Sequence, residues 1–281
     1  MKVIFLGGDL RQKYASEYLK SKDVESNAFL NFGFQNESIS EIIQSNVVAL
    51  PLPASKNENL LNVKDSDIEF RELINYISEN TLILGGNIPN SFYSLAPKNK
   101  LIDYYQNESF QISNALLSAE GAIYYAMDKI TDSIYGSKIA ILGFGRIGKI
   151  LSYLLKAQGA EISIFARKET DRAWGRLIGF NVARINDNII DKTIDQPYEF
   201  DIIFNTIPNH IMDEDFIRML TPKTLIIDLA SYPYGIDGVL VDKYGLRYHQ
   251  ESGIPGRYAP KSAGEIIGKT IFSILKKENL L

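Results

Sequence analysis

The sequence contains no cysteine and only two histidines among its 281 residues. Disulfide frameworks, thiolate nucleophiles and thiolate metal sites are therefore excluded, and two imidazoles are too few for a multi-histidine centre, so we expect no metal. No apolar stretch approaches the roughly 20 residues of a membrane helix. The opening residues, MKVIFLGGDLRQ, hold an apolar run too short for the core of a signal peptide. We expect a cytoplasmic protein without a membrane partner.

An excess of charge of one sign is also missing. The chain carries 30 basic and 34 acidic residues, which gives a formal net charge of -4. A nucleic-acid-binding surface needs clustered cations, so we expect no nucleic-acid partner. Apolar residues make up 45% of the chain and charged residues 23%, as in ordinary globular proteins. At roughly 100–200 residues per domain, the length suggests two domains.

Short apolar runs alternate with amphipathic stretches along both halves of the chain. This pattern is typical of right-handed β-α-β units, so we predict an α/β protein with two doubly wound domains, parallel sheets and long bridging helices. One domain is expected at 1–112, a bridging helix at 113–135, a second domain at 136–255, and a C-terminal helix within 256–281 that packs back on the first domain. The polar stretch 57–67 is predicted to be an exposed excursion.

The strongest motif is a G-x-G-x-x-G pattern between an apolar strand and an apolar helix. In this context the first glycine permits a tight turn, the second lets the backbone approach a pyrophosphate, and the third lets the helix pack closely. The helix N-terminus adds N–H groups and the positive end of its dipole. A Rossmann dinucleotide-binding domain is predicted, with a glycine-rich turn that binds nothing as the alternative. The predicted contacts are Gly143, Gly145, Arg146, Ile147 and Gly148.

The end of the next strand, at Ala166, bears on which cofactor binds. Enzymes that use NAD usually carry an acidic residue there, which bonds the ribose 2′-hydroxyl. This chain carries Arg167 and Lys168 instead. Two cations favour a 2′-phosphate, so we predict NADP, with NAD the less favoured cofactor. A solvated Arg167 is the alternative.

Two further loops follow apolar strands, where this fold places cofactor and substrate. The predicted cofactor-binding residues in these loops are Asn205, Thr206, Pro208, Asp228 and Ala230. Asparagine and aspartate are also common in turns and caps. A purely structural role for Asn205 and Asp228 is therefore an equal alternative.

The predicted substrate side is rich in anion-binding chemistry. Within GGDLRQ, Arg11 can hold a carboxylate bidentately, although Asp9 as a helix cap with a solvated Arg11 is the alternative. The stretch 252–264, SGIPGRYAPKSAG, joins proline rigidity to two cations at a helix start, as in a preformed anion site; an interdomain linker is the alternative. The predicted substrate-binding residues are Asp9, Arg11, Asn114, Arg257, Lys261 and Ser262.

Four stretches together resemble the family of dipicolinate synthase A subunits: GGDLRQ, SNALLSAEGAI, ILGFGRIGK and GIPGRYAPKSAG, in this order. The resemblance implies an oxidoreductase that uses a nicotinamide cofactor. Its substrate would be a dihydrodipicolinate-type dicarboxylate from the lysine pathway, and its product dipicolinic acid for bacterial spores. The resemblance further implies the mother-cell cytoplasm and a second, flavoprotein-like B subunit of dipicolinate synthase. Whether the chain forms a homo-oligomer is left open.

Aromatisation of such a substrate removes a hydride and a proton, so we expect a general base. The candidates are His249, Glu120 and Glu251. His210 follows the loop of Asn205 and Pro208, so lining the cofactor is the other role open to it. For either histidine, a surface or capped position without a catalytic role is the alternative. Two other functions stay open at this point. One is a general two-domain dehydrogenase of the 2-hydroxyacid or shikimate type. The other is an NADP-binding scaffold or regulatory subunit whose partner performs the chemistry.

Overall fold

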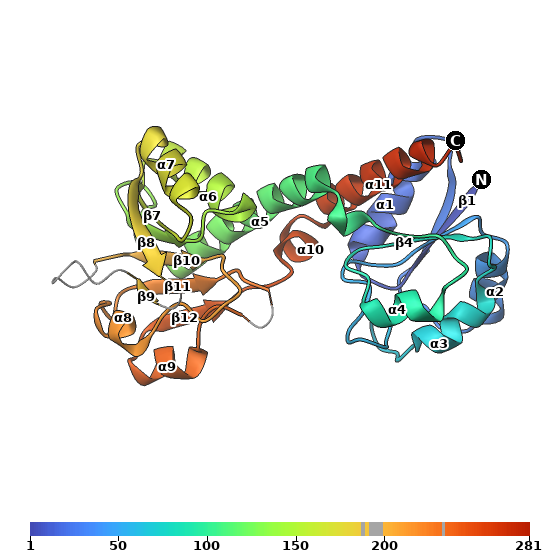
Figure 1. Ribbon diagram of the computed structural model, residues 1–281, viewed down its shortest axis with the longest axis horizontal. Helices are drawn as coiled ribbons and strands as arrows, with labels where there is room; N and C mark the ends of the chain where they lie inside the picture. The colour runs from blue at the N-terminus through green and yellow to red at the C-terminus, as the bar shows by residue number, and fades with distance from the viewer. Residues whose placement is uncertain (187–188, 191–198, 232–233) are drawn as a thin grey trace. The chain divides into compact units, whose positions relative to one another are not determined.

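The structure, a computed structural model, describes residues 1–186, 189–190, 199–231 and 234–281 (Figure 1). The chain divides into two compact units. The first consists of Met1–Asn114 together with Pro255–Leu281, and the second of Ala115–Ile254. No helix in these described ranges is long and apolar enough to cross a membrane.

The first unit is built on a parallel five-stranded sheet in the order β2-β1-β3-β4-β5. Its strands are β1 (Lys2–Leu6), β2 (Glu25–Phe29), β3 (Val47–Ala49), β4 (Leu82–Gly85) and β5 (Leu101–Asp103). Its helices are α1 (Leu10–Lys20), α2 (Asn36–Ile43), α3 (Phe70–Leu73), α4 (Asn90–Leu95) and α11 (Pro260–Lys277), and α10 (Ile254–Tyr258) begins at the unit boundary. The order of the strands reverses between β1 and β3, where open α/β sheets bind ligands.

Both faces of this sheet are buried, as parallel sheets require. In β1, Ile4 and Leu6 belong to a core cluster that α3 and α4 complete. Val3 and Phe5 point to the other cluster, which includes residues of α1 and α11. The apolar positions of α11 recur every four residues, at Ile267, Ile271 and Leu275, so one face of this helix packs on the first unit.

The prediction of an exposed excursion at 57–67 is confirmed for most of the segment but not for its centre. Leu61 and Val63 are fully buried in the core cluster of the first unit. Between them, the carbonyl of Asn62 accepts a hydrogen bond of 2.6 Å from the Gly8 amide. Two apolar side chains at alternate positions give too short a pattern to stand out in a polar segment, yet they suffice to fold it against the sheet.

The second unit has a seven-stranded sheet in the order β12-β11-β10-β6-β7-β8-β9. The strands are β6 (Lys138–Leu142), β7 (Glu161–Ala166), β8 (Asn181–Asn186), β9 (Ile189–Ile190), β10 (Ile202–Asn205), β11 (Leu225–Asp228) and β12 (Arg247–Gln250). All pair in parallel except β9 with β8. Apart from β9, this is the strand order of dinucleotide-binding sheets. The predicted fold class, two parallel-sheet α/β domains, is confirmed.

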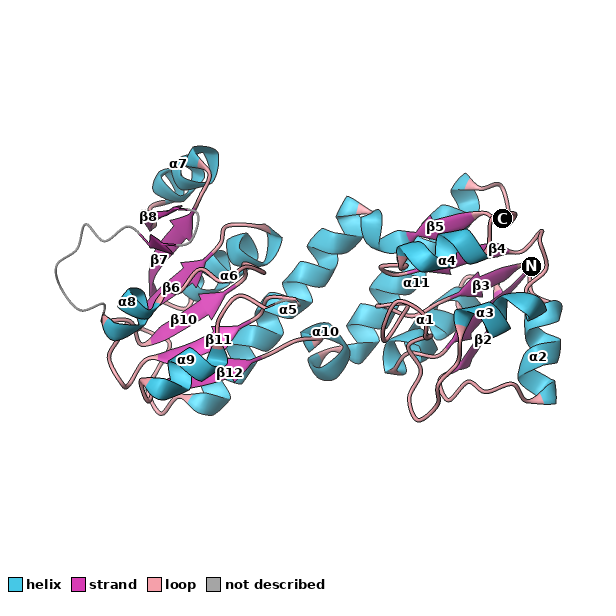
Figure 2. Cartoon of the chain, turned by 60° about the horizontal axis from the view of Figure 1, so that its bottom comes forward, coloured by secondary structure: helices cyan, strands magenta, loops and turns pink. Residues whose placement is uncertain are grey.

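Helices α6 (Arg146–Ala157), α7 (Glu169–Ile178), α8 (Glu214–Arg218) and α9 (Gly238–Lys243) are part of this unit (Figure 2). Phe216 of α8 and Val241 of α9 pack in one cluster with strand residues of β6, β10 and β11. Helix α5 (Glu108–Lys129) begins in the first unit and ends in the second. The strand order reverses between β6 and β10, so the loops after these two strands are where a ligand is expected.

Candidate functional site

The turn between β6 and α6 has the geometry that a dinucleotide fingerprint needs. Gly143 adopts a φ of +98°, and a Cβ there would collide with the Thr206 hydroxyl. A Cβ on Gly148 would collide with the Gly143 carbonyl oxygen, so α6 starts directly against the turn. Gly145 is the N-cap of α6, and a Cβ on it would meet no atom within 4 Å. The helix N-terminus therefore opens on free space, which suits an approaching anion.

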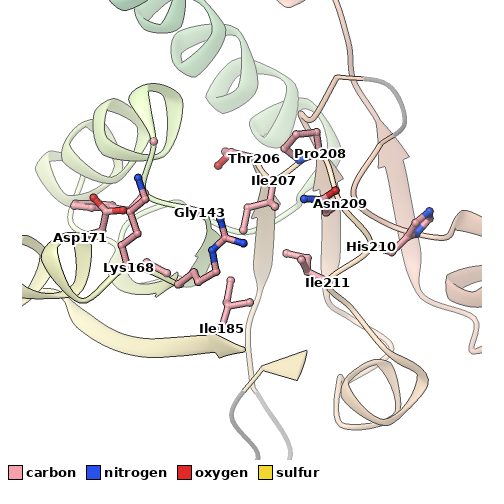
Figure 3. A pocket seen from close by; sticks show the side chains of 14 residues that line it. Gly143, Lys168, Asp171, Ile185, Thr206, Ile207, Pro208, Asn209, His210 and Ile211 are labelled. Carbon is pink, nitrogen blue, oxygen red and sulfur yellow. The ribbon is translucent and has the colours of Figure 1, made fainter. Parts of the chain in front are cut away.

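This space is part of a pocket of about 640 Å³ at the carboxyl ends of β6, β7 and β10 (Figure 3). Its lining residues come from those strand ends, from α7 and from β8. Six of them are predicted cofactor-binding residues: Gly143, Gly145, Arg167, Lys168, Thr206 and Pro208. The others are Phe144, Ala166, Asp171, Ile185, Ile207, Asn209, His210 and Ile211. Of these, Ala166 and Ile207 were recognised from the sequence only as parts of strand-end segments, and His210 as a residue that lines the cofactor.

The remaining predicted cofactor-binding residues, Arg146, Ile147, Gly148, Asn205, Asp228 and Ala230, do not line this pocket. Asn205 and Asp228 are fully buried at the ends of β10 and β11, where Asn205 donates a hydrogen bond of 2.8 Å to Asp228. Their place directly after apolar strands was a correct signal for the loops. That position in the sequence does not indicate whether the two side chains face the pocket or the protein interior.

The cationic wall of the pocket is fixed by its own backbone contacts. Arg172 of α7 donates to the carbonyl oxygens of Ala166 and Arg167, at 2.9 and 2.6 Å. These bonds fix the backbone at the end of β7, directly beside the exposed side chains of Arg167 and Lys168. Figure 3 shows Lys168 and Asp171 on one side of the pocket and Thr206, Ile207 and Ile211 across from them.

One carboxylate, that of Asp171, shares this wall with the cations. It lies 3.7 Å from the Lys149 ammonium of α6. The nearby Glu169 carboxyl has its pKa lowered by hydrogen bonds from Arg176 and Arg172. A pocket with two cations, one carboxylate near a lysine and an open helix N-terminus is suited to a ligand that carries several phosphates.

The three candidate bases lie outside this pocket. The His249 ring, in β12, packs edge-on against Tyr125 of α5, with 5.6 Å between ring centroids. Burial, followed by the charges of Lys129 and Arg247, lowers the pKa of His249. Glu251 follows β12 and is buried, with its amide donating to the Asp228 carbonyl at 2.8 Å. Glu120 is exposed on α5.

The lowered pKa of His249 predicts a pH dependence of stability. The unfolded imidazole, with a pKa near 6.5, takes up a proton before the folded one does. The free energy of unfolding therefore contains a contribution that is complete above the unfolded pKa and is lost as the pH falls below it. The variant His249→Gln lacks this contribution to the pH dependence.

As the pH falls from about 7.5 to about 5.5, we expect the wild type to lose stability that His249→Gln does not lose. The free energy of unfolding of the variant should therefore rise relative to that of the wild type. The free energy of unfolding of both proteins is measured at each pH by urea unfolding, followed by the fluorescence of Trp174, the single tryptophan. The same pH dependence in both would contradict a lowered pKa for the half-buried imidazole.

In the first unit, Arg11 and Asp9 bind each other. Asp9 is the N-cap of α1 and accepts from the Arg11 amide at 3.0 Å. The Arg11 guanidinium donates to both Asp9 oxygens, each at 2.9 Å, and to the Leu52 carbonyl at 2.6 Å. Asp9 thus caps the helix, but the alternative of a solvated Arg11 was wrong, because its side chain is only 12% exposed.

The segment from Pro255 to Ser262 lies next to this pair. A Cβ on Gly256 would come within 2.9 Å of both Arg11 Nε and Asp9 Oδ2. Arg257 follows it, exposed, with its guanidinium 5.4 Å from the centroid of the Tyr258 ring. Lys261 and Ser262 are exposed in the first turn of α11, and Asn114 is half-buried in α5. Three cations thus come from segments that meet at the start of α1.

The chain is similar to dipicolinate synthase A subunits in both sequence and structure. Residues 2–105 match the family described as the N-terminal domain of the dipicolinate synthase A subunit. The chain is 29% identical to the dipicolinate synthase A subunit of Bacillus subtilis (strain 168), over 98% of this chain and 96% of that protein. A crystal structure of the A subunit from Bacillus subtilis has a TM-score of 0.83 and 26% identity, covering 100% of this chain and 97% of the other.

A more distant likeness extends to dehydrogenases. A D-isomer specific 2-hydroxyacid dehydrogenase from Lactobacillus delbrueckii ssp. bulgaricus, solved in its NAD complexed form, has a TM-score of 0.60 and 14% identity. The match covers 99% of this chain and 98% of that one. This identity is low enough that the likeness concerns the fold alone. The resemblance to dipicolinate synthase A subunits that was predicted from the sequence is confirmed.

Proposed function

We propose that the chain oxidises a dihydrodipicolinate-type dicarboxylate to dipicolinic acid with NADP, because residues 2–105 match the N-terminal domain of dipicolinate synthase A subunits and the whole chain is similar to such an A subunit. The observation that carries the cofactor assignment is the pocket of the second unit. There the glycine turn, the open start of α6 and the pair Arg167 and Lys168 face one space of suitable size.

Each part of the pocket fits one part of the cofactor. The backbone at Gly143–Gly145 and the first turn of α6 would bind the pyrophosphate. Arg167 and Lys168 would bind the 2′-phosphate through charge-assisted hydrogen bonds. The loop Thr206–Ile211 would form the opposite wall, and Thr206 is held there by donating to the Leu142 carbonyl at 2.9 Å. When bound, NADP supplies the acceptor for the hydride.

The substrate carries two carboxylates, and the first unit offers cations for them. Arg11 is held in one orientation by Asp9 and the Leu52 carbonyl, so it loses little freedom when it binds an anion. Arg257 and Lys261 are the further proposed partners, with Asn114 and Ser262 as neutral donors. His249, Glu251 and Glu120 remain the proposed proton acceptors, and the lowered pKa keeps the His249 imidazole neutral and able to accept a proton.

A partner protein is part of this proposal, because the relative is named as one subunit of its synthase. We propose a flavoprotein-like B subunit of dipicolinate synthase as this partner. A scaffold role for the present chain is the competing function, since the three candidate bases do not line the cofactor pocket.

An absorbance assay tests the proposal. The purified chain is mixed with a freshly made dihydrodipicolinate precursor and NADP, with and without the partner protein. We expect the reduced-nicotinamide band to grow with the chain alone, because hydride acceptance needs only the bound cofactor. Growth only after the partner is added would instead support the scaffold role. No growth in either mixture would contradict both.

A further inference from the structure

Two fully buried polar side chains, Asn205 and Asp228, join the loops that follow β10 and β11. Asn205 Nδ2 donates to Asp228 Oδ1 at 2.8 Å. Buried polar groups usually have partners, but here the pair is also connected to both loops at once. Neither residue lines the pocket of the second unit.

Asp228 collects hydrogen bonds from its own loop. Its Oδ1 accepts from the Ala230 amide and its Oδ2 from the Gly235 amide, each at 3.0 Å. The Tyr248 hydroxyl, from β12, lies 3.5 Å from Oδ2. One carboxylate therefore connects a strand end, the loop after it and a neighbouring strand.

Asn205 does the same for the loop that forms the pocket wall. Its Oδ1 accepts from the Ile207 amide at 3.1 Å, and its Nδ2 donates to the Ile207 carbonyl at 3.0 Å. The Gly235 backbone packs directly against these groups, because a Cβ there would collide with both Asn205 Nδ2 and the Ile207 carbonyl oxygen. Further along, the Ile211 amide donates to the Gly235 carbonyl at 3.4 Å.

The loop Thr206–Ile211 supplies six of the pocket's lining residues. These contacts hold it at Ile207 and at Ile211. We propose that Asn205 and Asp228 are positioning residues for the cofactor. They do not touch it, but their amide–carboxylate pair holds the Thr206–Ile211 wall in the shape that binds it. The inference rests on the proposed nicotinamide site.

The variant Asn205→Asp makes this role measurable. It keeps the shape of the side chain but places a second carboxylate against Asp228. Two carboxylates in contact cannot both ionise freely, so at low pH they share a proton and stay hydrogen-bonded, while at high pH they repel. The other groups that face Asp228 are the Tyr248 hydroxyl and, around that hydroxyl, Asp237 and Tyr234. Burial and the Asp228 charge raise the pKa of Tyr248, so it stays protonated throughout the test.

The matched control is Asn209→Asp. Asn209 lies in the same loop and lines the pocket, but its side chain is exposed. An exposed aspartate has a pKa of about 4, so the new carboxylate carries the same charge at both pH values of the test. Dissociation constants for NADPH are measured by titration at about pH 6 and about pH 8.5, with circular dichroism to show that each protein is folded.

We expect the ratio of the Asn205→Asp and wild-type dissociation constants to rise at least about tenfold between these pH values, and the Asn209→Asp ratio to stay constant. A folded Asn205→Asp protein whose ratio does not change would overturn the inference and leave the proposed function intact. If the wild type binds no NADPH, the proposed function fails and the inference with it.

A second variant covers the case in which Asn205→Asp does not fold at the higher pH. In Asn205→Ser, one hydroxyl can serve Asp228 or Ile207 but not both, so we expect NADPH binding weakened by about tenfold at either pH. Affinity equal to the wild type would overturn the positioning role. A lower thermal stability with unchanged affinity would do so as well, because it would show that the pair serves only the fold.

Discussion

Replacing Arg167 by aspartate is expected to weaken NADPH binding by about 100-fold or more, and NADH binding by less than about threefold. The 2′-phosphate of NADPH would lose charge-assisted hydrogen bonds worth about 1.5–3 kcal/mol each and would meet a like charge instead. NADH has only a hydroxyl at this position, which an aspartate can even accept from. Titration of both cofactors into the full chain gives the two ratios.

The control for this prediction is Arg184→Asp. Arg184 is exposed in β8, in register with Ala166 of β7, and does not line the pocket. Arg184→Asp changes the net charge of the protein by the same amount, but one strand away from the pocket. A loss of affinity that is seen only in Arg167→Asp is therefore due to the contact at the pocket and not to the change in net charge. An equal loss of NADPH and NADH affinity in Arg167→Asp would show that the 2′-phosphate assignment is wrong.

The second large effect is expected for Arg11→Gln, which should raise the KM for the dicarboxylate substrate by about 100-fold and leave the dissociation constant for NADPH unchanged. The Nε and Nη2 atoms of Arg11 are engaged by Asp9 and the Leu52 carbonyl, while Nη1 has no hydrogen-bond partner in the described part of the chain. That leaves a fixed cationic edge to receive a carboxylate. Glutamine keeps the helix start but removes the charge.

Lys13→Gln serves as the control, because Lys13 is an exposed cation on the same helix, 56% accessible and weakly paired with Glu17. Steady-state kinetics with varied substrate and a separate NADPH titration give the two quantities. A change in NADPH affinity with an unchanged KM for substrate would show that Arg11 supports the fold rather than the substrate.

The sequence predicted the parts of the fold that depend on local patterns. The glycine spacing predicted a tight turn between a strand and a helix, and the structure has it, with Gly143 at a positive φ. Helix α3 is followed by a 3-10 turn over Ile74–Tyr76, and no sequence pattern marks this change of pitch.

Residues that reach the pocket from other strands could not be predicted in the same way. Ile185 comes from β8 and Asp171 from the first turn of α7, and both are close to Gly143 only because the sheet places their strands side by side. For Asn205 and Asp228, residue type and position indicated the correct loops. Whether their side chains face the pocket or the interior depends on hydrogen bonds between two loops that are more than 20 residues apart in sequence.

The most direct test of the central claim follows the hydride itself. A dihydrodipicolinate-type substrate that carries deuterium at the carbon to be oxidised is turned over by this chain with NADP, and the nicotinamide product is analysed by mass spectrometry. We expect NADPH to carry the deuterium. Dipicolinic acid formed alongside unlabelled NADPH, or without reduction of NADP, would contradict it.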